Sequence, residues 1–152
     1  MTEAISDWIE IPQSKVTAFA DLTEDWQYIH IDADLAKETP FGGTIAHGFL
    51  MLSLFTRFSE TALPPWNHPD YDVLMSMNYG FDRIRFLLPV PTGSRVRARF
   101  DNPALRDKGH DRVVLSYTVS VEIEGADQPA IIADWLFFLV LTPKKEQTTD
   151  SA

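Results

Sequence analysis

Cysteine is absent from the 152-residue sequence, which excludes disulfides, thiolate metal ligands and a cysteine nucleophile. Basic residues are scarce: the sequence has 13 Lys and Arg but 22 Asp and Glu, which gives a net charge of −9. Nucleic-acid phosphates are bound by clustered basic residues, so this charge argues against a nucleic-acid partner. No apolar run reaches the roughly 20 residues of a membrane helix, and the opening MTEAISDWIE lacks the pattern of a secretory signal. We therefore expect a cytoplasmic protein with no membrane partner.

The composition that remains is that of a folded globular protein. Apolar residues make up 45% of the chain and charged residues 23%, and the length suits one domain with its own core. The final residues, PKKEQTTDSA, lack large apolar side chains. We predict a single domain over residues 1–142 and a disordered tail over residues 143–152.

Helical and strand patterns occupy separate parts of the chain. A short strand is expected at residues 8–11, followed by a helix from Pro12 with an apolar face at helical spacing. A loop with one helical turn at residues 34–37 comes next. A long apolar helix is predicted at residues 44–60, and alternation predicts strands at residues 74–86, 94–100, 112–124 and 130–141.

The helix over residues 44–60 is apolar on nearly every side, which predicts that it is buried within the protein. Gly48 lies inside this helix, where glycine is less favourable than alanine by about 1 kcal/mol. A glycine in such a place is typical of a position where another group comes close to the backbone. The order of elements predicts an α+β fold in which an antiparallel sheet wraps around one long buried central helix.

Three side chains that could carry chemistry lie in or beside DWQYIHIDADLAKETPFGGTIAHGF, residues 25–49. On a continuous helix Asp25 and His30 would point about 140° apart, so they converge only if the segment is a loop. Each group also has an ordinary explanation, as a surface pair for Asp25 and His30 and as a core or capping imidazole for His47. The three match the residue types of a zinc site, but no paired histidine spacing supports one, and we expect no metal.

Arginines alternate on two of the predicted strands. Arg95, Arg97 and Arg99 share one face of a strand, and Arg83 and Arg85 lie two residues apart on the preceding strand. Such a row is either a solvated sheet face or a docking patch for a polyanionic ligand, and periodicity alone leaves both open.

Taken as one unit, residues 25–53 resemble the MaoC-like family of (R)-specific enoyl-CoA hydratases and dehydratases. A weaker match, NYGFDRIRFLLPVPTGSRVRARF, resembles a later strand pair of that family, and with QYIH it is similar to the nodulation protein N-like branch. The residues that carry the resemblance, with their spacing kept, are Asp25, His30, Asp32, Ala36, Phe41-Gly42-Gly43, Ile45-Ala46-His47-Gly48 and Ser53.

The resemblance implies a hotdog fold and a homodimer that binds acyl-CoA or an acyl-carrier thioester. It implies reversible hydration of a trans-2-enoyl thioester to an (R)-3-hydroxyacyl thioester, without a resident cofactor. Asp25 and His30 would hold and activate the attacking water. Charge on the thioester oxygen would be stabilised at the start of the central helix, and the residues implied there are Gly43, Ala46, His47 and Gly48.

Supporting and binding roles also follow from the resemblance. Gln27 and Ser53 would support the catalytic loop, although a helix serine usually bonds back to its own helix. His47 is expected to support the helix start rather than to react. The CoA phosphates would be bound by Arg83, Arg85 and Arg97.

The sequence departs from the family pattern Gly-Asp-x-Asn-Pro-x-His, because Gln27 replaces Asn and Tyr28 replaces Pro. This departure affects the expected substrate range more than the reaction type. Two alternatives stay open: a thioesterase of the same fold, and a protein that binds acyl-CoA without chemistry. Thioesterases of this shape generally carry a carboxylate on the central helix, and none occurs between Ile45 and Ser59.

Overall fold

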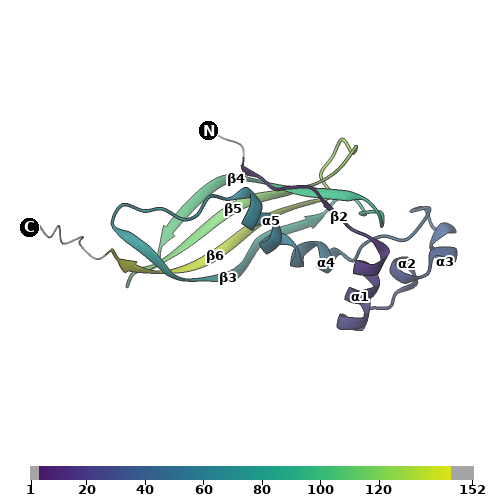
Figure 1. Ribbon diagram of the computed structural model, residues 1–152, viewed down its shortest axis with the longest axis horizontal. Coiled ribbons are helices and arrows are strands. Elements are labelled where there is room, and N and C mark those ends of the chain that lie inside the picture. The colour runs from purple at the N-terminus through teal and green to yellow at the C-terminus, as the bar shows by residue number, and fades with distance from the viewer. Residues whose placement is uncertain (1–3, 145–152) are drawn as a thin grey trace, which may run out of the picture.

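A computed structural model describes residues 4–144 and shows one antiparallel sheet with helices along one side and at one end (Figure 1). The six strands lie in the order β1-β4-β5-β6-β3, and β2 also pairs with β4. The strands are β1 Ala4–Ile5, β2 Ile9–Glu10, β3 Tyr71–Phe86, β4 Arg95–Asp107, β5 Arg112–Ile123 and β6 Ile131–Pro143. The helices are α1 Gln13–Thr23, α2 Tyr28–Ile31, α3 Ala33–Lys37, α4 Gly48–Ser53 and α5 Phe55–Ala62.

The four predicted long strands are confirmed, and β4 is longer than its alternation indicates. The pattern predicts an end at Phe100, but the strand continues to Asp107. Its register shifts between Asp101 and Ala104, where Asn102 has a left-handed φ of 51°. Such a bulge accommodates the intervening proline, which has no N–H to donate, and it interrupts the alternation on which the prediction rests.

The central helix begins later than predicted and consists of two segments. Residues 44–47 are extended because the N–H groups of Ile45 and Ala46 donate to distant carbonyl oxygens, at 3.0 and 2.8 Å. α4 therefore begins at Gly48, and a tightened turn at Leu54 separates it from α5.

One face of α4 and α5 supplies the core, and the sheet curves around it as the predicted fold requires (Figure 1). Phe55 packs edge-to-face on Trp135 of β6, with ring centroids 5.5 Å apart. The indole Nε1 of Trp135 donates to Asn78 Oδ1 on β3 at 2.9 Å, so this buried polar atom is satisfied. The prediction of burial on every side is wrong for the first turn, where Phe49 is 73% exposed.

Helices α1, α2 and α3 gather at one end of the sheet, beside the start of α4 (Figure 1). α1 begins one residue later than predicted, with Pro12 as its N-cap, and buries Val16 and Ala20. α3 agrees with the turn expected at residues 34–37. α2 lies in a segment predicted as loop, because four residues are too few to show a helical period.

The last strand extends beyond its predicted end at Leu141. β6 reaches Pro143, and the Lys144 N–H donates to Asp70 O at 2.9 Å. The rest of the predicted tail, residues 145–152, lies outside the described residues. Within residues 4–144, no helix combines the length and the apolarity needed to cross a membrane.

Candidate active site

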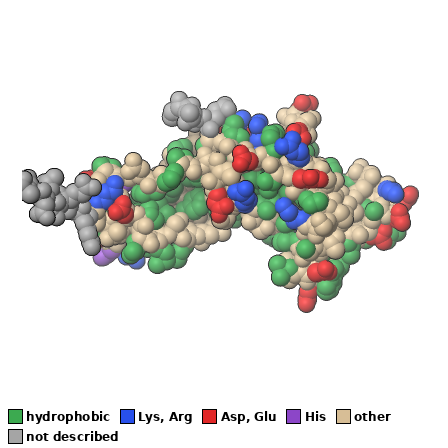
Figure 2. Space-filling view, in the orientation of Figure 1, with side chains coloured by type: hydrophobic (Ala, Val, Ile, Leu, Met, Phe, Trp, Pro, Cys, Tyr) green, Lys and Arg blue, Asp and Glu red, His purple; other side chains and the backbone are tan. Residues whose placement is uncertain are grey.

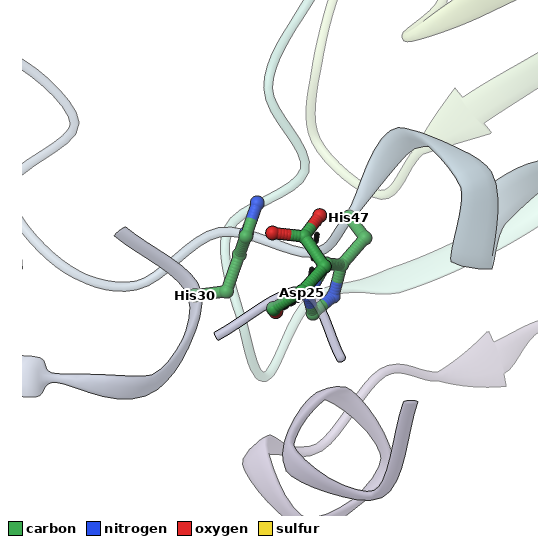
Figure 3. A group of neighbouring side chains, drawn as sticks. All are labelled: Asp25, His30 and His47. Carbon is green, nitrogen blue, oxygen red and sulfur yellow. Dashed lines mark hydrogen bonds and ion pairs between the residues drawn. The ribbon is translucent and has the colours of Figure 1, made fainter. Parts of the chain in front are cut away.

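Asp25, His30 and His47 come from separate segments and meet at one point (Figure 3). Asp25 lies between α1 and α2, His30 lies in α2, and His47 directly precedes α4. One oxygen or nitrogen of each side chain lies within 4.8 Å of the others. Asp25 and His30 were expected to converge only if no continuous helix joined them, and none does, because α1 ends before Asp25 and α2 begins after it.

His30 is held as a neutral imidazole with one lone pair available. Its side chain is buried, and Nδ1 lies 2.7 Å from the Ile45 carbonyl oxygen. A carbonyl only accepts, so Nδ1 carries the hydrogen and Nε2 carries the lone pair. Burial lowers the pKa of His30 below its ordinary value of 6.5, partly opposed by the bond to Ile45. His47 lowers that pKa further and the charge of Asp25 raises it, so the ring remains uncharged at neutral pH.

His47 connects the loop of Asp25 to the start of α4. Its ring is 2% exposed, stacks on His30 with centroids 3.8 Å apart and packs against Phe19 of α1 at 5.1 Å. Nε2 donates to the Asp25 carbonyl oxygen at 2.9 Å. These contacts support a positioning role for His47, as expected from the resemblance.

The backbone at Asp25 is restrained, whereas its carboxylate is accessible. Glu24 ends α1 with a left-handed φ of 61°, and Trp26 Nε1 donates to Asp21 Oδ1 at 2.9 Å. The Asp25 carboxylate is half-exposed and lies 4.0 Å from His47 Nε2, which is too far for a hydrogen bond. The carboxylate is therefore available to a water molecule or a ligand.

His30 borders an apolar cavity of about 470 Å³ at the start of α4. This volume lies within the range of about 300–1,000 Å³ that is usual for small-molecule sites. The lining residues are His30, Phe41, Ile45, Ala46, Gly48, Phe49, Met51, Phe86, Leu87, Leu88, Pro89, Val90 and Ile131.

Gly48 is the best placed of the backbone groups predicted to face the substrate. It lines the same cavity as His30. The bond from Met51 N–H to His47 O closes the first turn of α4, so the Gly48 N–H has no partner within the helix.

Two other predicted oxyanion-binding positions fit less well. The Ala46 N–H donates to Val90 O at 2.8 Å and is not available to a substrate, which corrects the assignment of Ala46. Gly43 lies in the turn before this segment and is not among the residues that line the cavity. Both differences arise because residues 44–47 are extended rather than helical.

The two predicted supporting residues have different environments. Gln27 precedes α2, and its carbonyl oxygen accepts the His30 N–H at 2.9 Å, but its side chain makes no capping bond. Ser53 Oγ donates to Leu50 O in its own helix at 2.6 Å. The expected contact of Ser53 with the catalytic loop is therefore replaced by the ordinary helix bond.

Gln13, the first residue of α1, belongs to the site and was not predicted. Its Nε2 donates to His30 O at 2.8 Å, and its Oε1 accepts from the Thr44 hydroxyl at 2.7 Å. Gln13 thus joins α1 to α2 and to the segment before α4. No local pattern signals this role, because its partners lie 17 and 31 residues away.

A close approach to Gly48 is confirmed, and the approaching group is the ring of Phe86. A Cβ placed on Gly48 would lie 2.8 Å from Phe86 Cε1. Phe86 ends β3 and lines the cavity, so it is a second residue of the site that was not predicted.

The arginines of β4 are paired with acidic residues. Arg97 Nε donates to Glu122 at 2.7 Å, and its guanidinium lies 4.5 Å from the Trp8 ring centroid. Arg97 lines a different cavity from His30, so its placement does not support phosphate binding. On the face drawn in Figure 2, basic side chains lie beside acidic ones rather than forming one basic patch.

The arginines of β3 are exposed. Arg83 forms an ion pair with Asp134 at 3.3 Å, whereas Arg85 donates to the Ile84 carbonyl at 2.7 Å. Arg85 directly precedes Phe86, but successive side chains of a strand point to opposite faces of the sheet, so this position does not place the Arg85 guanidinium in the cavity.

Asp25, His30 and His47 also have the residue types of a catalytic zinc site. In this arrangement His47 Nε2 carries a hydrogen to the Asp25 carbonyl and cannot ligate an ion while that bond persists. His47 Nδ1 is buried and has no hydrogen-bond partner among residues 4–144. The Nε2 bond of His47 therefore supports a positioning role, and Nδ1 is the one nitrogen of this ring whose lone pair could bind an ion.

The chain is similar to known proteins over most of its length. The family model of the MaoC like domain matches residues 2–123. The chain is 43% identical over 139 residues to nodulation protein N of Rhizobium leguminosarum bv. viciae, covering 91% of this chain and 84% of that protein. It is 42% identical over 132 residues to 3-hydroxyacyl-thioester dehydratase Z of Mycobacterium tuberculosis, covering 85% and 82%.

A solved structure supports the same relationship. The (R)-hydratase from A. caviae superposes with a TM-score of 0.65 at 26% identity, over 90% of this chain and 92% of that chain. The chain therefore belongs to the MaoC-like family of hydratases and dehydratases.

Proposed function

We propose that this protein reversibly hydrates trans-2-enoyl thioesters to (R)-3-hydroxyacyl thioesters. The observation that carries the proposal is the meeting of Asp25 and His30 within 4.8 Å, beside an apolar cavity that also contains Gly48. The relatives named as a 3-hydroxyacyl-thioester dehydratase and an (R)-hydratase support this reaction class.

A carboxylate oxygen of Asp25 and a ring nitrogen of His30 lie no more than 4.8 Å apart, a distance that one water molecule can bridge. Two hydrogen bonds of about 2.8 Å at a tetrahedral angle span about 4.6 Å. Water would donate one hydrogen bond to the Asp25 carboxylate and the other to Nε2 of His30. Because His30 is neutral at neutral pH, its lone pair is available to take a proton from this water.

The proton that leaves water returns to the substrate. As the water oxygen bonds to C3, His30 accepts a proton and the electrons of the double bond move to the thioester oxygen. The imidazolium then donates this proton to C2, so one water supplies both added groups. Asp25 stabilises the transient imidazolium, since its charge raises the pKa of His30.

The negative charge on the thioester oxygen needs a hydrogen-bond donor in the cavity. The Gly48 N–H meets this need, because no bond inside α4 uses it. The chain's own groups thus supply the water activation, the proton and the oxyanion contact, and we propose that no metal or organic cofactor takes part. Unchanged activity after dialysis against a chelator would agree with this, whereas loss that zinc restores would contradict it.

Turnover of short and medium enoyl-CoAs, followed by chiral analysis of the product, tests the proposal. Asp25→Asn and His30→Ala should each lower kcat by about 10²- to 10⁴-fold with an unchanged circular dichroism spectrum. Asp34→Asn is the matched control, because Asp34 is an exposed carboxylate paired with Lys37. No turnover by the wild type, or (S) product, would contradict the proposal, and release of free CoA would indicate a thioesterase instead.

We also propose that Arg85 contacts the anionic part of the thioester carrier. It is exposed and is next in the chain to Phe86 of the cavity wall, with its side chain on the opposite face of β3, so a long carrier would have to pass the end of this strand to reach it. Arg85→Glu should raise the KM for enoyl-CoA and leave kcat nearly unchanged. Arg106→Glu, on an exposed arginine paired with Asp82, is the control.

The proposed functional form is a cytoplasmic homodimer. Among residues 4–144, β3 ends the strand order and pairs only with β6, so its outer edge offers backbone groups that no described strand pairs with. Its exposed large apolar side chains include Leu74, Met75, Met77 and Tyr79. A second copy that pairs along this edge would cover both features.

A further inference from the structure

The ring of Phe86 lies against the backbone at Gly48, in the cavity that contains His30. A Cβ placed on Gly48 would lie 2.8, 3.1 and 3.2 Å from Cε1, Cζ and Cδ1 of this ring. Carbon atoms in contact are optimally about 3.5–4.0 Å apart. An added carbon beside the Gly48 Cα therefore cannot fit while the ring keeps this position.

Phe86 is anchored through its backbone. It ends β3 opposite Ile131, and the next N–H, that of Leu87, donates to Ala130 O at 2.7 Å. Phe86 is 51% exposed, so about half of its surface is covered, and one of the groups it contacts is the Gly48 backbone. The anchored backbone keeps the ring beside Gly48.

We propose that Phe86 determines specificity, as a steric gate over Gly48 that admits enoyl thioesters unbranched at C2 and excludes those with a methyl group there. This inference rests on the proposed function, in which the thioester oxygen binds at the Gly48 N–H. C2 is bonded directly to the carbonyl carbon, so a C2 substituent is the acyl branch nearest to the ring. A branch at the far end of the acyl chain lies away from Gly48 and does not meet the gate.

The test compares kcat/KM for three enoyl-CoAs: a linear one, its 2-methyl analogue, and an isomer with the methyl branch on the last carbons of the chain. We expect the wild type to prefer the linear substrate over the 2-methyl analogue by about 10- to 200-fold, as is usual for one methylene in an apolar pocket. Phe86→Ala should reduce this preference by about tenfold and leave discrimination against the distal branch unchanged. Phe86→Leu, which retains more packing, should have an intermediate effect. Leu105→Ala, which removes an exposed apolar side chain on β4, is the control.

The outcomes separate the gate from the proposed function. If the wild type hydrates the linear substrate and neither Phe86 variant changes the preference for it over the 2-methyl analogue, the gate is overturned and the proposed function stands. A wild type that hydrates no enoyl-CoA overturns the proposed function, and the gate with it.

A second measurement tests the contact without using activity. Gly48→Ala should lower the urea midpoint of unfolding in the wild-type background and lower it less in the Phe86→Ala background. Equal shifts in both backgrounds would overturn the contact on which the gate depends.

Discussion

The imidazole rings of His30 and His47 stack with centroids 3.8 Å apart and an interplanar angle of 26°. Each ring donates one hydrogen bond to a backbone carbonyl, His30 to Ile45 and His47 to Asp25. The base, the loop that carries the carboxylate and the start of α4 are thereby joined in one unit. Because the His47 ring is 2% exposed and its Nε2 hydrogen is bonded to the Asp25 carbonyl, its effect on the reaction is positional.

We expect His47→Phe to lower kcat by about tenfold or more while KM changes little. Phenylalanine keeps a ring against His30 but loses the bond to the Asp25 carbonyl, so the carboxylate is no longer held in place. Loss of that bond should also lower the free energy of unfolding by about 1–2 kcal/mol. Steady-state kinetics and urea denaturation measure the two effects. Phe19→Leu, which alters only the other neighbour of His47, serves as the comparison, and an unchanged kcat in His47→Phe would refute the positional role.

The lowered pKa of His30 predicts how stability and activity depend on pH. Above pH 6.5 the ring is neutral in both the folded and the unfolded chain, so its contribution to stability is complete. As the pH falls from 6.5 through the lower pKa of the folded state, the unfolded chain binds more protons and that contribution is lost. Activity should fall over the same acidic range, because a protonated His30 cannot accept a proton from water. NMR titration of the ring measures the pKa, and His30→Gln should remove this component of the stability profile; a pKa at or above 6.5 would contradict the prediction.

Gln13→Ala should lower both stability and activity, although Gln13 does not line the cavity. The substitution removes one hydrogen bond to His30 O and one from the Thr44 hydroxyl, each worth about 0.5–1.5 kcal/mol. Thermal or urea unfolding and kcat measure the outcome. Thr17→Ala removes the third, exposed partner of Gln13 and should have little effect. Equal behaviour of the two variants would show that the contacts of Gln13 with the site are unimportant.

A charged residue on the outer edge of β3 should prevent dimer formation. We expect the double substitution Met75→Lys and Met77→Lys to convert a wild-type dimer into a monomer, because lysines on an edge strand oppose edge-to-edge pairing. Light scattering coupled to size-exclusion chromatography reports the mass. Leu105→Lys places the same charge at an exposed apolar position of β4 and should leave the dimer intact. A monomeric wild type would contradict the prediction directly.

Much of the fold could be predicted from local patterns. Alternation located the four long strands, and the apolar run after Gly43 located the central helix within a few residues. The spacing from Asp25 through His30 to Gly48 was enough to predict the family, because these residues of the site lie in one short stretch of chain. Helix α2 was missed since four residues carry no periodic signal.

Partners distant in the chain decided the remaining features. The Ala46 N–H is occupied by the Val90 carbonyl, and Arg97 is paired with Glu122, so both groups already have a partner from a distant part of the chain. The ring that covers Gly48 comes from Phe86, at the end of a strand formed 38 residues later. The local sequence determined which residue types lie near the site, because most of them come from one short stretch of chain whose spacing can be read directly. Only the tertiary structure determined which of their polar atoms remain available, because strand pairing and side-chain packing bring in the groups that compete for them.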